Sequence, residues 1–162
     1  QNLDPLFKNE EELREFRQRH SREKIDFKDL DKHRGNTFLG IDAGSTTTKA
    51  VLIDEDNNIL YSYYGGNKGK PLDLAIKILN EVYEKLPQGA NITYSGSTGY
   101  GEDFIKSALN LDVGEVETIA HYKAAKYFKK DVDFVLDIGG QDMKSMHIHD
   151  GVIDSITLNE AC

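Results

Sequence analysis

One short pattern occurs twice in this sequence: an apolar stretch, then Asp, any residue, Gly, four further residues and Lys. Its two copies pair Asp42 with Asp137, Gly44 with Gly139, and Lys49 with Lys144. A carboxylate at the end of a buried strand is held rigidly enough to orient a hydrated Mg²⁺ ion, which nucleotide sites bind through one or two carboxylates. The glycine lets the turn bring successive backbone N–H groups close to an anion. Two such turns facing each other would hold a polyphosphate from both sides.

The two turns carry different residues between Gly and Lys. The first adds the hydroxyls of Ser45, Thr46 and Thr47, whereas the second has Gly140 and Gln141, and a glutamine there could orient an attacking water. A single Asp-x-Gly is also a common hairpin turn. Two copies with matched lysines and apolar approach strands favour a phosphate site instead. A P-loop is excluded because G-x-x-x-x-G-K-[ST] is absent and a strand, not a helix, is expected after each turn.

Periodicity predicts the elements that must position these turns, in the order βββ, α, β, α, α, βββ. The predicted strands cover 37–44, 48–55, 59–66, 91–97, 132–140, 143–151 and 152–158, and the predicted helices cover 71–86, 101–110 and 116–130. Short connections between the first three strands predict an antiparallel meander. The highly charged stretch 1–36 predicts a short exposed helix near 10–22, followed by a linker.

Composition limits the class of protein. A chain of 162 residues and 18.3 kDa suits one compact domain, with or without a tail. The net charge of -8 argues against binding to nucleic acid or to an anionic membrane, and no apolar run approaches the ~18 to 20 residues that span a bilayer. One cysteine allows no internal disulfide, and no signal peptide is recognisable, so we expect a cytoplasmic protein. The first residue, Gln1, suggests a piece of something longer.

Two motifs carry a resemblance to known proteins. The stretches "GIDAGSTTTKAVLID" and "VLDIGG" resemble the phosphate-1 and phosphate-2 motifs of the acetate and sugar kinase, chaperone and actin superfamily. Within that superfamily, the ordered set "GIDAGSTTTK", "STGYGED", "EVETIAHYKAA", "LDIGGQDMK" and "LNEAC" resembles the BadF/BadG/BcrA/BcrD ATPase family. More narrowly, they are similar to activators of 2-hydroxyacyl-CoA dehydratases, also called CoA-substrate-specific enzyme activases. The resemblance covers roughly residues 37–162, and residues 1–36 more weakly resemble the segment before the second activase unit of large fused members.

The resemblance implies an α/β fold of ribonuclease H-like lobes, as in actin-like ATPases, with a mixed sheet. Residues 1–36 would form a charged helix and linker, residues 37–132 the first lobe with the phosphate-1 motif, and residues 133–162 the truncated start of a second lobe with the phosphate-2 motif.

The resemblance also implies roles for single residues. The ATP phosphates would contact Gly44, Ser45, Thr46, Thr47 and Lys49 from the first turn and Gly139, Gly140 and Gln141 from the second. Asp42 and Asp137 would lie beside Mg²⁺, and with Gln141, which would position water, they form the expected catalytic set. Cys162, in "NEAC", stands where the family has the first cysteine ligand of a 4Fe-4S cluster.

In that family, ATP hydrolysis changes the angle between the subunits of a homodimer, and the shared cluster passes a low-potential electron to a dehydratase or reductase. The expected partner is therefore an iron-sulfur enzyme, of the 2-hydroxyacyl-CoA dehydratase or benzoyl-CoA reductase kind. The family pattern continues past this cysteine with a second cysteine and the adenosine-binding part. We therefore expect that this chain alone holds no intact cluster, binds ATP weakly or not at all, and acts as a homodimer or fused two-unit equivalent when full length.

Two other functions remain open. One is a sugar kinase of the same superfamily, of the N-acetylglucosamine type, and the other is a nonenzymatic actin-like or chaperone-like nucleotide switch, since one fold hosts many functions.

Three other groups of residues can each be interpreted in two ways. Gly99 and Gly101 either present N–H groups to an anion or form a tight turn. Glu117 and His121 suit a surface or interface pair better than an acid-base pair, and His147 and His149 share a strand face without an evident third metal ligand.

Overall fold

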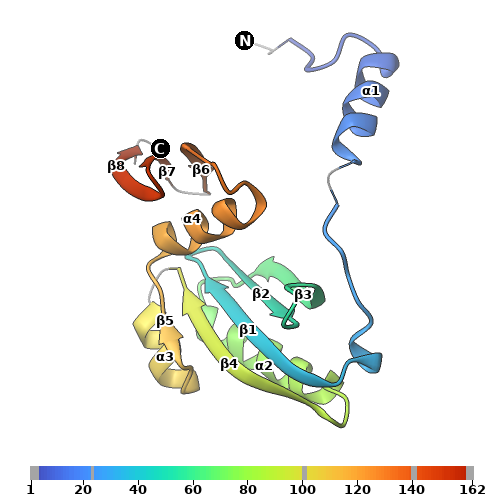
Figure 1. Cartoon of the computed structure of the whole chain (residues 1–162), viewed down its shortest axis with the longest axis vertical. Helices are drawn as coiled ribbons and strands as arrows, with labels where there is room; N and C mark the ends of the chain where they lie inside the picture. The colour runs from blue at the N-terminus through green and yellow to red at the C-terminus, as the bar shows by residue number, and fades with distance from the viewer. Residues whose placement is uncertain (1–3, 23, 100–101, 140–141, 160–162) are drawn as a thin grey trace.

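The computed structural model describes residues 4–22, 24–99, 102–139 and 142–159 (Figure 1). In chain order, its elements are α1 (Glu10–His20), a 3-10 helix (Leu30–Lys32), β1 (Gly35–Ala43), β2 (Thr47–Ile53), β3 (Ile59–Gly66), α2 (Pro71–Lys85), β4 (Ala90–Thr98), α3 (Glu102–Leu109), β5 (Val113–Gly114), α4 (Glu117–Phe128), β6 (Phe134–Ile138), β7 (Met143–His149) and β8 (Val152–Asn159). Within these described stretches, no helix has the length and apolar character needed to cross a membrane.

The first sheet has five strands in the order β3-β2-β1-β4-β5. β1, β2 and β3 form the antiparallel meander that the sequence predicts. β4 runs parallel to β1, and β5 runs parallel to β4, so the sheet is mixed. The sequence does not predict β5, because a strand of two residues, Val113 and Gly114, is too short to show a period.

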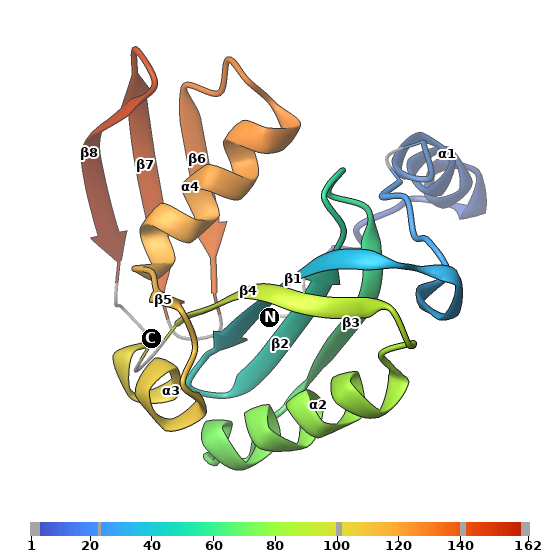
Figure 2. The same cartoon turned by 60° about the horizontal axis from the view of Figure 1, so that its bottom comes forward.

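Helices α2 and α3 cover one face of this sheet, as Figure 2 shows. Alternate residues of β1 and β2 point into the core they enclose, including the fully buried Ile41 and Leu52, which pack with Ile78 and Val82 of α2. Pro71 begins α2 because its missing N–H costs nothing at the first helical position. The residues in between, which include Asp42 and Lys49, therefore point to the opposite face of the sheet.

The second sheet has three antiparallel strands in the order β6-β7-β8. α4 packs against it through a separate small core, in which Tyr122 contacts Met146 and Ile148. The Tyr122 hydroxyl also donates a hydrogen bond of 2.6 Å to the carbonyl oxygen of Gly151, in the β7–β8 turn. α4 is thus fixed to the second sheet, although it follows directly on the last strand of the first.

The N-terminal stretch begins with α1, which stands apart from both sheets (Figure 1). Asn9 caps α1, its side chain accepting from the backbone N–H of Glu12, and the helix ends at His20, two residues before the predicted end. None of its residues is buried. The following stretch was predicted as a linker, but Leu30 of the 3-10 helix is buried in the main core.

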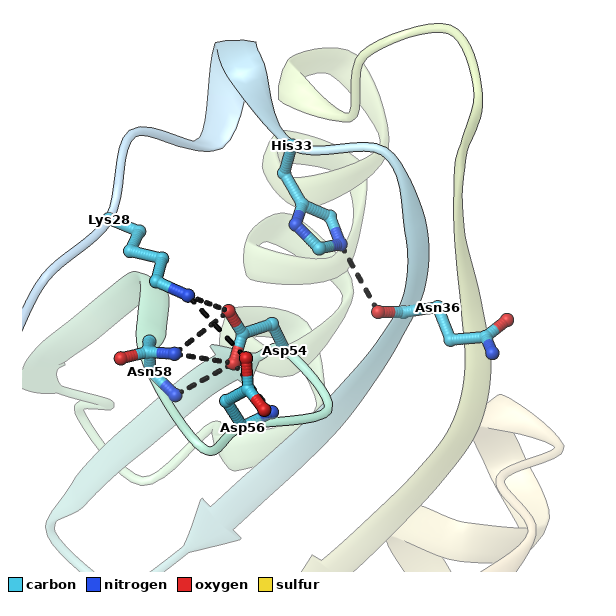
Figure 3. Close-up of polar contacts among 6 residues, drawn as sticks. All are labelled: Lys28, His33, Asn36, Asp54, Asp56 and Asn58. Atoms are coloured by element: carbon cyan, nitrogen blue, oxygen red, sulfur yellow. Dashed lines mark hydrogen bonds and ion pairs between the residues drawn. The ribbon is translucent and has the colours of Figure 1, made fainter.

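A polar cluster also fastens this stretch to the β2–β3 turn, as Figure 3 shows. Lys28 Nζ donates to Asp54 Oδ2 at 2.9 Å, and Asp54 Oδ1 accepts from the backbone N–H groups of Asp56 and Asn58. Burial alone would raise the pKa of Asp54, but the hydrogen bonds from Lys28 and Asn58 outweigh it and lower the pKa to about 2. The ionised carboxylate of Asp54 therefore anchors residues before β1 to the first sheet.

Candidate functional site

The first copy of the repeated pattern forms the β1–β2 hairpin. Asp42 and Lys49 lie directly opposite each other across it, and Lys49 Nζ donates to Asp42 Oδ2 at 2.8 Å. Both side chains are partly exposed, at 19% and 39% for Asp42 and Lys49. The turn between them leaves Ser45 and Thr46 exposed, as a phosphate-contacting turn requires. A side chain at Gly44 would lie 2.9 Å from the carbonyl oxygen of Thr47, so only glycine fits this tight turn.

Asn67, which follows β3, supports this turn from the side. Its side-chain amide donates to the carbonyl oxygen of Gly44 at 2.7 Å, and its backbone N–H donates to the carbonyl oxygen of Thr46 at 2.9 Å. Asn67 is buried, so these bonds are shielded from water. The sequence analysis missed this residue, and the only signal for it was its place in the "GGNKG" turn after the third strand.

The second carboxylate oxygen of Asp42 lies at the wall of the site. Asp42 Oδ1 is buried and has no hydrogen-bond partner among the described residues. Gly99, with a φ of 95°, lies against it, because a side chain at that position would approach Asp42 Oδ1 to 2.6 Å. An unpaired buried carboxylate oxygen is costly in a protein interior. This oxygen therefore suits a cation such as Mg²⁺, and Gly99 lies beside it, whereas Gly101 is outside the described residues.

The second copy forms the β6–β7 hairpin with the same register, since Asp137 lies opposite Lys144. The contacts nevertheless differ from the first copy. His121 Nδ1 lies 2.7 Å from Asp137 Oδ2, and Lys144 Nζ donates to Glu117 at 2.9 Å and lies 3.2 Å from Asp142 Oδ2. Because an ionised carboxylate only accepts, His121 Nδ1 is the donor. Burial lowers the pKa of Lys144, but its bonds to these two carboxylates outweigh that effect and raise the pKa above the usual value.

Gly139 begins the turn of this second hairpin. Its backbone N–H donates to the carbonyl oxygen of Asp142 at 2.9 Å, so Asp142 closes the turn. A side chain at Gly139 would approach Asp142 Oδ1 to 3.2 Å, which leaves little room for any other residue. Gly140 and Gln141, both predicted to face the terminal phosphate, lie outside the described residues, as does Cys162.

α4 contacts both hairpins. Its Glu117 and His121 bind the second hairpin, and its Ala120 lines the same pocket as Asp42 and Lys49 of the first. The two views agree in placing the start of α4 above the edge of the first sheet where β1 ends (Figures 1 and 2). The two copies of the pattern therefore meet at α4, which the sequence analysis could not foresee from the spacing of Glu117 and His121 alone.

The pocket next to the first hairpin lies on the sheet face that α2 and α3 leave open. It has a volume of about 320 Å³, near the lower limit for small-molecule sites. Gly40 and Gly96 are direct neighbours on β1 and β4 and line one part of the pocket. Two residues further along these strands, Asp42 and Thr98 form a polar end with Lys49. The geometry offers a charged end for phosphate and cation beside an apolar surface.

The histidines of β7 contact an aromatic ring and a carboxylate. The His147 ring packs against Phe134, with ring centroids 5.0 Å apart, and His149 pairs with Asp150. Across the described stretches, no group of three or more His, Cys, Asp or Glu side chains is close enough to bind a metal ion. A cation at Asp42 or Asp137 would thus take most of its ligands from water and phosphate, as Mg²⁺ does in nucleotide sites.

Comparison of the sequence with known protein families identifies the family of this chain. The sequence profile of the BadF/BadG/BcrA/BcrD ATPase family matches residues 39–162. The chain belongs to this family. Its relatives include the (R)-2-hydroxyglutaryl-CoA dehydratase activating ATPase of Acidaminococcus fermentans, 27% identical over 76% of this chain and 47% of the relative. They also include the activator of lactoyl-CoA dehydratase of Anaerotignum propionicum, 30% identical over 76% of this chain and 47% of the relative.

Solved structures of family members have the same fold. Component A of the Acidaminococcus fermentans dehydratase superposes with a TM-score of 0.61 at 26% identity, covering 78% of this chain and 48% of that chain. The activator of the 2-hydroxyisocaproyl-CoA dehydratase from Clostridium difficile, solved with bound ADPNP, gives 0.60 at 25% identity, covering 78% and 46%. The predicted α/β, ribonuclease H-like fold of actin-like ATPases is confirmed. This BadF/BadG/BcrA/BcrD chain spans about half the length of the relatives it matches.

Proposed function

We propose that this chain is the nucleotide-binding part of an ATP-dependent activase that delivers low-potential electrons to a dehydratase-like or reductase-like iron-sulfur enzyme. One observation carries the proposal: two hairpins with the same Asp–Lys register meet at α4, in a chain of the BadF/BadG/BcrA/BcrD ATPase family. The names of two relatives as dehydratase activators support the choice of partner.

In this proposal, the first hairpin binds the ATP phosphates. The exposed turn at Ser45 and Thr46 offers hydroxyl and backbone N–H donors, and Lys49 supplies a positive charge. Asn67 holds the turn in shape through Gly44, which reduces the reorganisation that binding requires. Gly139, Gly140 and Gln141 of the second hairpin contact the terminal phosphate from the other side.

Two carboxylates would hold Mg²⁺ between the hairpins. Asp42 offers its unpaired Oδ1, and Asp137 offers the oxygen that His121 leaves free. When bound, Mg²⁺ neutralises charge that develops on the phosphates during hydrolysis. Gln141 orients the attacking water. Because only phosphate contacts that differ between the ATP and ADP states can bias a conformational change, hydrolysis at this site would set the angle between two subunits or fused units.

The electron-transfer part of the proposal rests on Cys162. Cys162 would be one ligand of a 4Fe-4S cluster shared between two subunits or fused units, which would be the source of the low-potential electron. Cys162 is outside the described residues, so the support is its sequence context, "NEAC", and the family match that extends to it.

ATP hydrolysis by the full-length protein tests the nucleotide part. We expect Mg²⁺-dependent phosphate release that falls at least about 100-fold in Asp137→Asn, because an electrostatic contact to the transition state is lost. Asp131→Asn, on an exposed carboxylate that pairs with Lys129, is the control and should match the wild type. Phosphate transfer to N-acetylglucosamine instead of water would contradict the activase and favour a kinase.

A further inference from the structure

The two lysines of the repeat make different contacts although their hairpins share one register. Lys49 pairs with the aspartate opposite it, Asp42, at 2.8 Å. Lys144 lies opposite Asp137 in the same way, yet its ion pairs are with Glu117 at 2.9 Å and Asp142 at 3.2 Å. The backbone of the hairpin thus permits an Asp137–Lys144 pair, and the shorter of the two contacts that draw the lysine away comes from Glu117 of α4.

α4 also supplies the group that takes the place of the lysine on Asp137. His121 lies one helical turn after Glu117, so both point from the same face of α4 toward the hairpin. His121 Nδ1 donates a hydrogen bond of 2.7 Å to Asp137 Oδ2. An imidazole N–H satisfies one carboxylate oxygen without the permanent charge of a lysine ammonium group.

We propose that Glu117 is a positioning residue that holds Lys144 away from Asp137, so that the Asp137 carboxylate stays available to a divalent cation. This inference rests on the proposed function, because it concerns the same nucleotide site. A lysine ammonium beside Asp137 would repel the cation and compete with it for the carboxylate. The two hairpins then contribute differently: Lys49 binds one oxygen of Asp42 and leaves Oδ1 for the cation, whereas Asp137 has its lysine held away by α4.

The test measures how the binding of ADPNP, a nonhydrolysable ATP analogue, depends on Mg²⁺ concentration, by titration calorimetry of the full-length protein. Glu117→Asp keeps the charge but shortens the side chain, which releases Lys144 toward Asp137. The Mg²⁺ concentration at half-maximal binding should rise about fivefold, the effect of one ion pair in a wet site. Adding Lys144→Met to Glu117→Asp should restore the wild-type value, which loss of packing alone would not do.

A matched control is available on α2. Glu81 pairs with Lys85 at 2.6 Å and has a side-chain exposure of 34%, against 35% for Glu117. Glu81→Asp should leave the Mg²⁺ dependence unchanged, and melting temperatures of both Asp variants check that they are folded. If Glu117→Asp is unfolded, Glu117→Gln, which keeps the length and loses the charge, should shift the Mg²⁺ dependence in the same direction.

Two results would overturn the inference: an unchanged Mg²⁺ dependence in folded Glu117→Asp, or a shift that Lys144→Met does not reverse. A wild-type protein that binds no ADPNP at any Mg²⁺ concentration would instead contradict the proposed function itself. The two failures are therefore distinguishable.

Discussion

The Asp42–Lys49 ion pair of the first hairpin should contribute little to the free energy of folding. Both side chains are reached by solvent, and an ion pair in this setting stabilises a fold by only about 0 to 1 kcal/mol. The same ammonium group, placed beside a phosphate, makes a charge-assisted contact that is roughly twice as strong as a neutral hydrogen bond. We therefore expect Lys49 to matter far more for binding than for stability.

Lys49→Met separates these two contributions. It should weaken the binding of ADPNP with Mg²⁺ by at least about tenfold, because a charge-assisted hydrogen bond to phosphate is lost. The melting temperature should stay close to the wild-type value. Titration calorimetry and thermal unfolding measure the two effects. Lys85→Met, which removes a lysine from the comparable pair with Glu81 on α2, is the control and should bind normally.

Asn67 supports the turn of the first hairpin. Asn67→Ala removes the donor to the carbonyl oxygen of Gly44 and leaves that contact unmade. The expected cost is roughly 1 to 3 kcal/mol of stability, together with weaker nucleotide binding, because a buried polar partner is lost. Chemical denaturation and calorimetry check both. Normal stability and normal binding in this variant would show that the turn holds its shape without Asn67.

At the scale of elements, the sequence predicts well what local spacing determines. The meander, the long amphipathic α2 and both Asp–Lys hairpins follow from apolar alternation and from the fixed number of residues between Asp and Lys. β5 was missed because two residues carry no period. The ion pair between Lys144 and Glu117 could not be predicted from the sequence either, because it depends on how α4 packs, which no local pattern encodes. Whether Gln141 and Cys162 act as proposed stays a prediction.

The anchoring of the N-terminal stretch belongs to this scale as well. The pKa of Asp54 is about 2, below the usual value of 3.8 for an aspartate, because the bonds from Lys28 and Asn58 outweigh burial. A carboxyl whose pKa is lowered by folding contributes stability above its unfolded pKa and loses it as the pH falls toward the folded pKa. The segment before β1 should therefore loosen in acid, between about pH 4 and pH 2.

Asp54→Asn tests this contribution. At pH 7 the variant should be less stable than the wild type by roughly 2 kcal/mol, the equivalent of the pKa difference. The difference should shrink as the pH falls from about 4 to 2, where the wild-type carboxyl becomes protonated. Urea denaturation over a pH series measures it. Asp56→Asn, on a side chain that is 83% exposed, should show no such trend, and a pH-independent difference for Asp54→Asn would contradict the assignment.

Across the whole molecule, the two sheets have separate cores and α4 joins them. One core lies between the first sheet and helices α2 and α3, and the other holds Tyr122, Met146 and Ile148. A ligand that contacts both hairpins would therefore tie two units together, and the free energy of binding would add to the stability of that arrangement. This is how nucleotide state could set the relative position of the two units.

The role of Cys162 is a prediction for the full-length protein. Cys162→Ala should abolish cluster-dependent reduction of the partner enzyme, because a ligand of the cluster is lost. Nucleotide binding should stay largely intact, since Cys162 takes no part in the phosphate contacts we propose. Iron and sulfide analysis after anaerobic reconstitution, combined with ADPNP titration, separates the two properties. Unimpaired electron transfer in this variant would show that Cys162 is not a ligand.

The central claim is that the two hairpins bind one nucleotide together. Hydrogen–deuterium exchange of the full-length protein, with and without ADPNP and Mg²⁺, tests it in a single measurement because each hairpin gives its own peptides. We predict slower exchange in both turns, residues 43–48 and residues 138–143, at the same ligand concentration. Slower exchange in only one turn, or in neither when calorimetry shows binding, would contradict the claim.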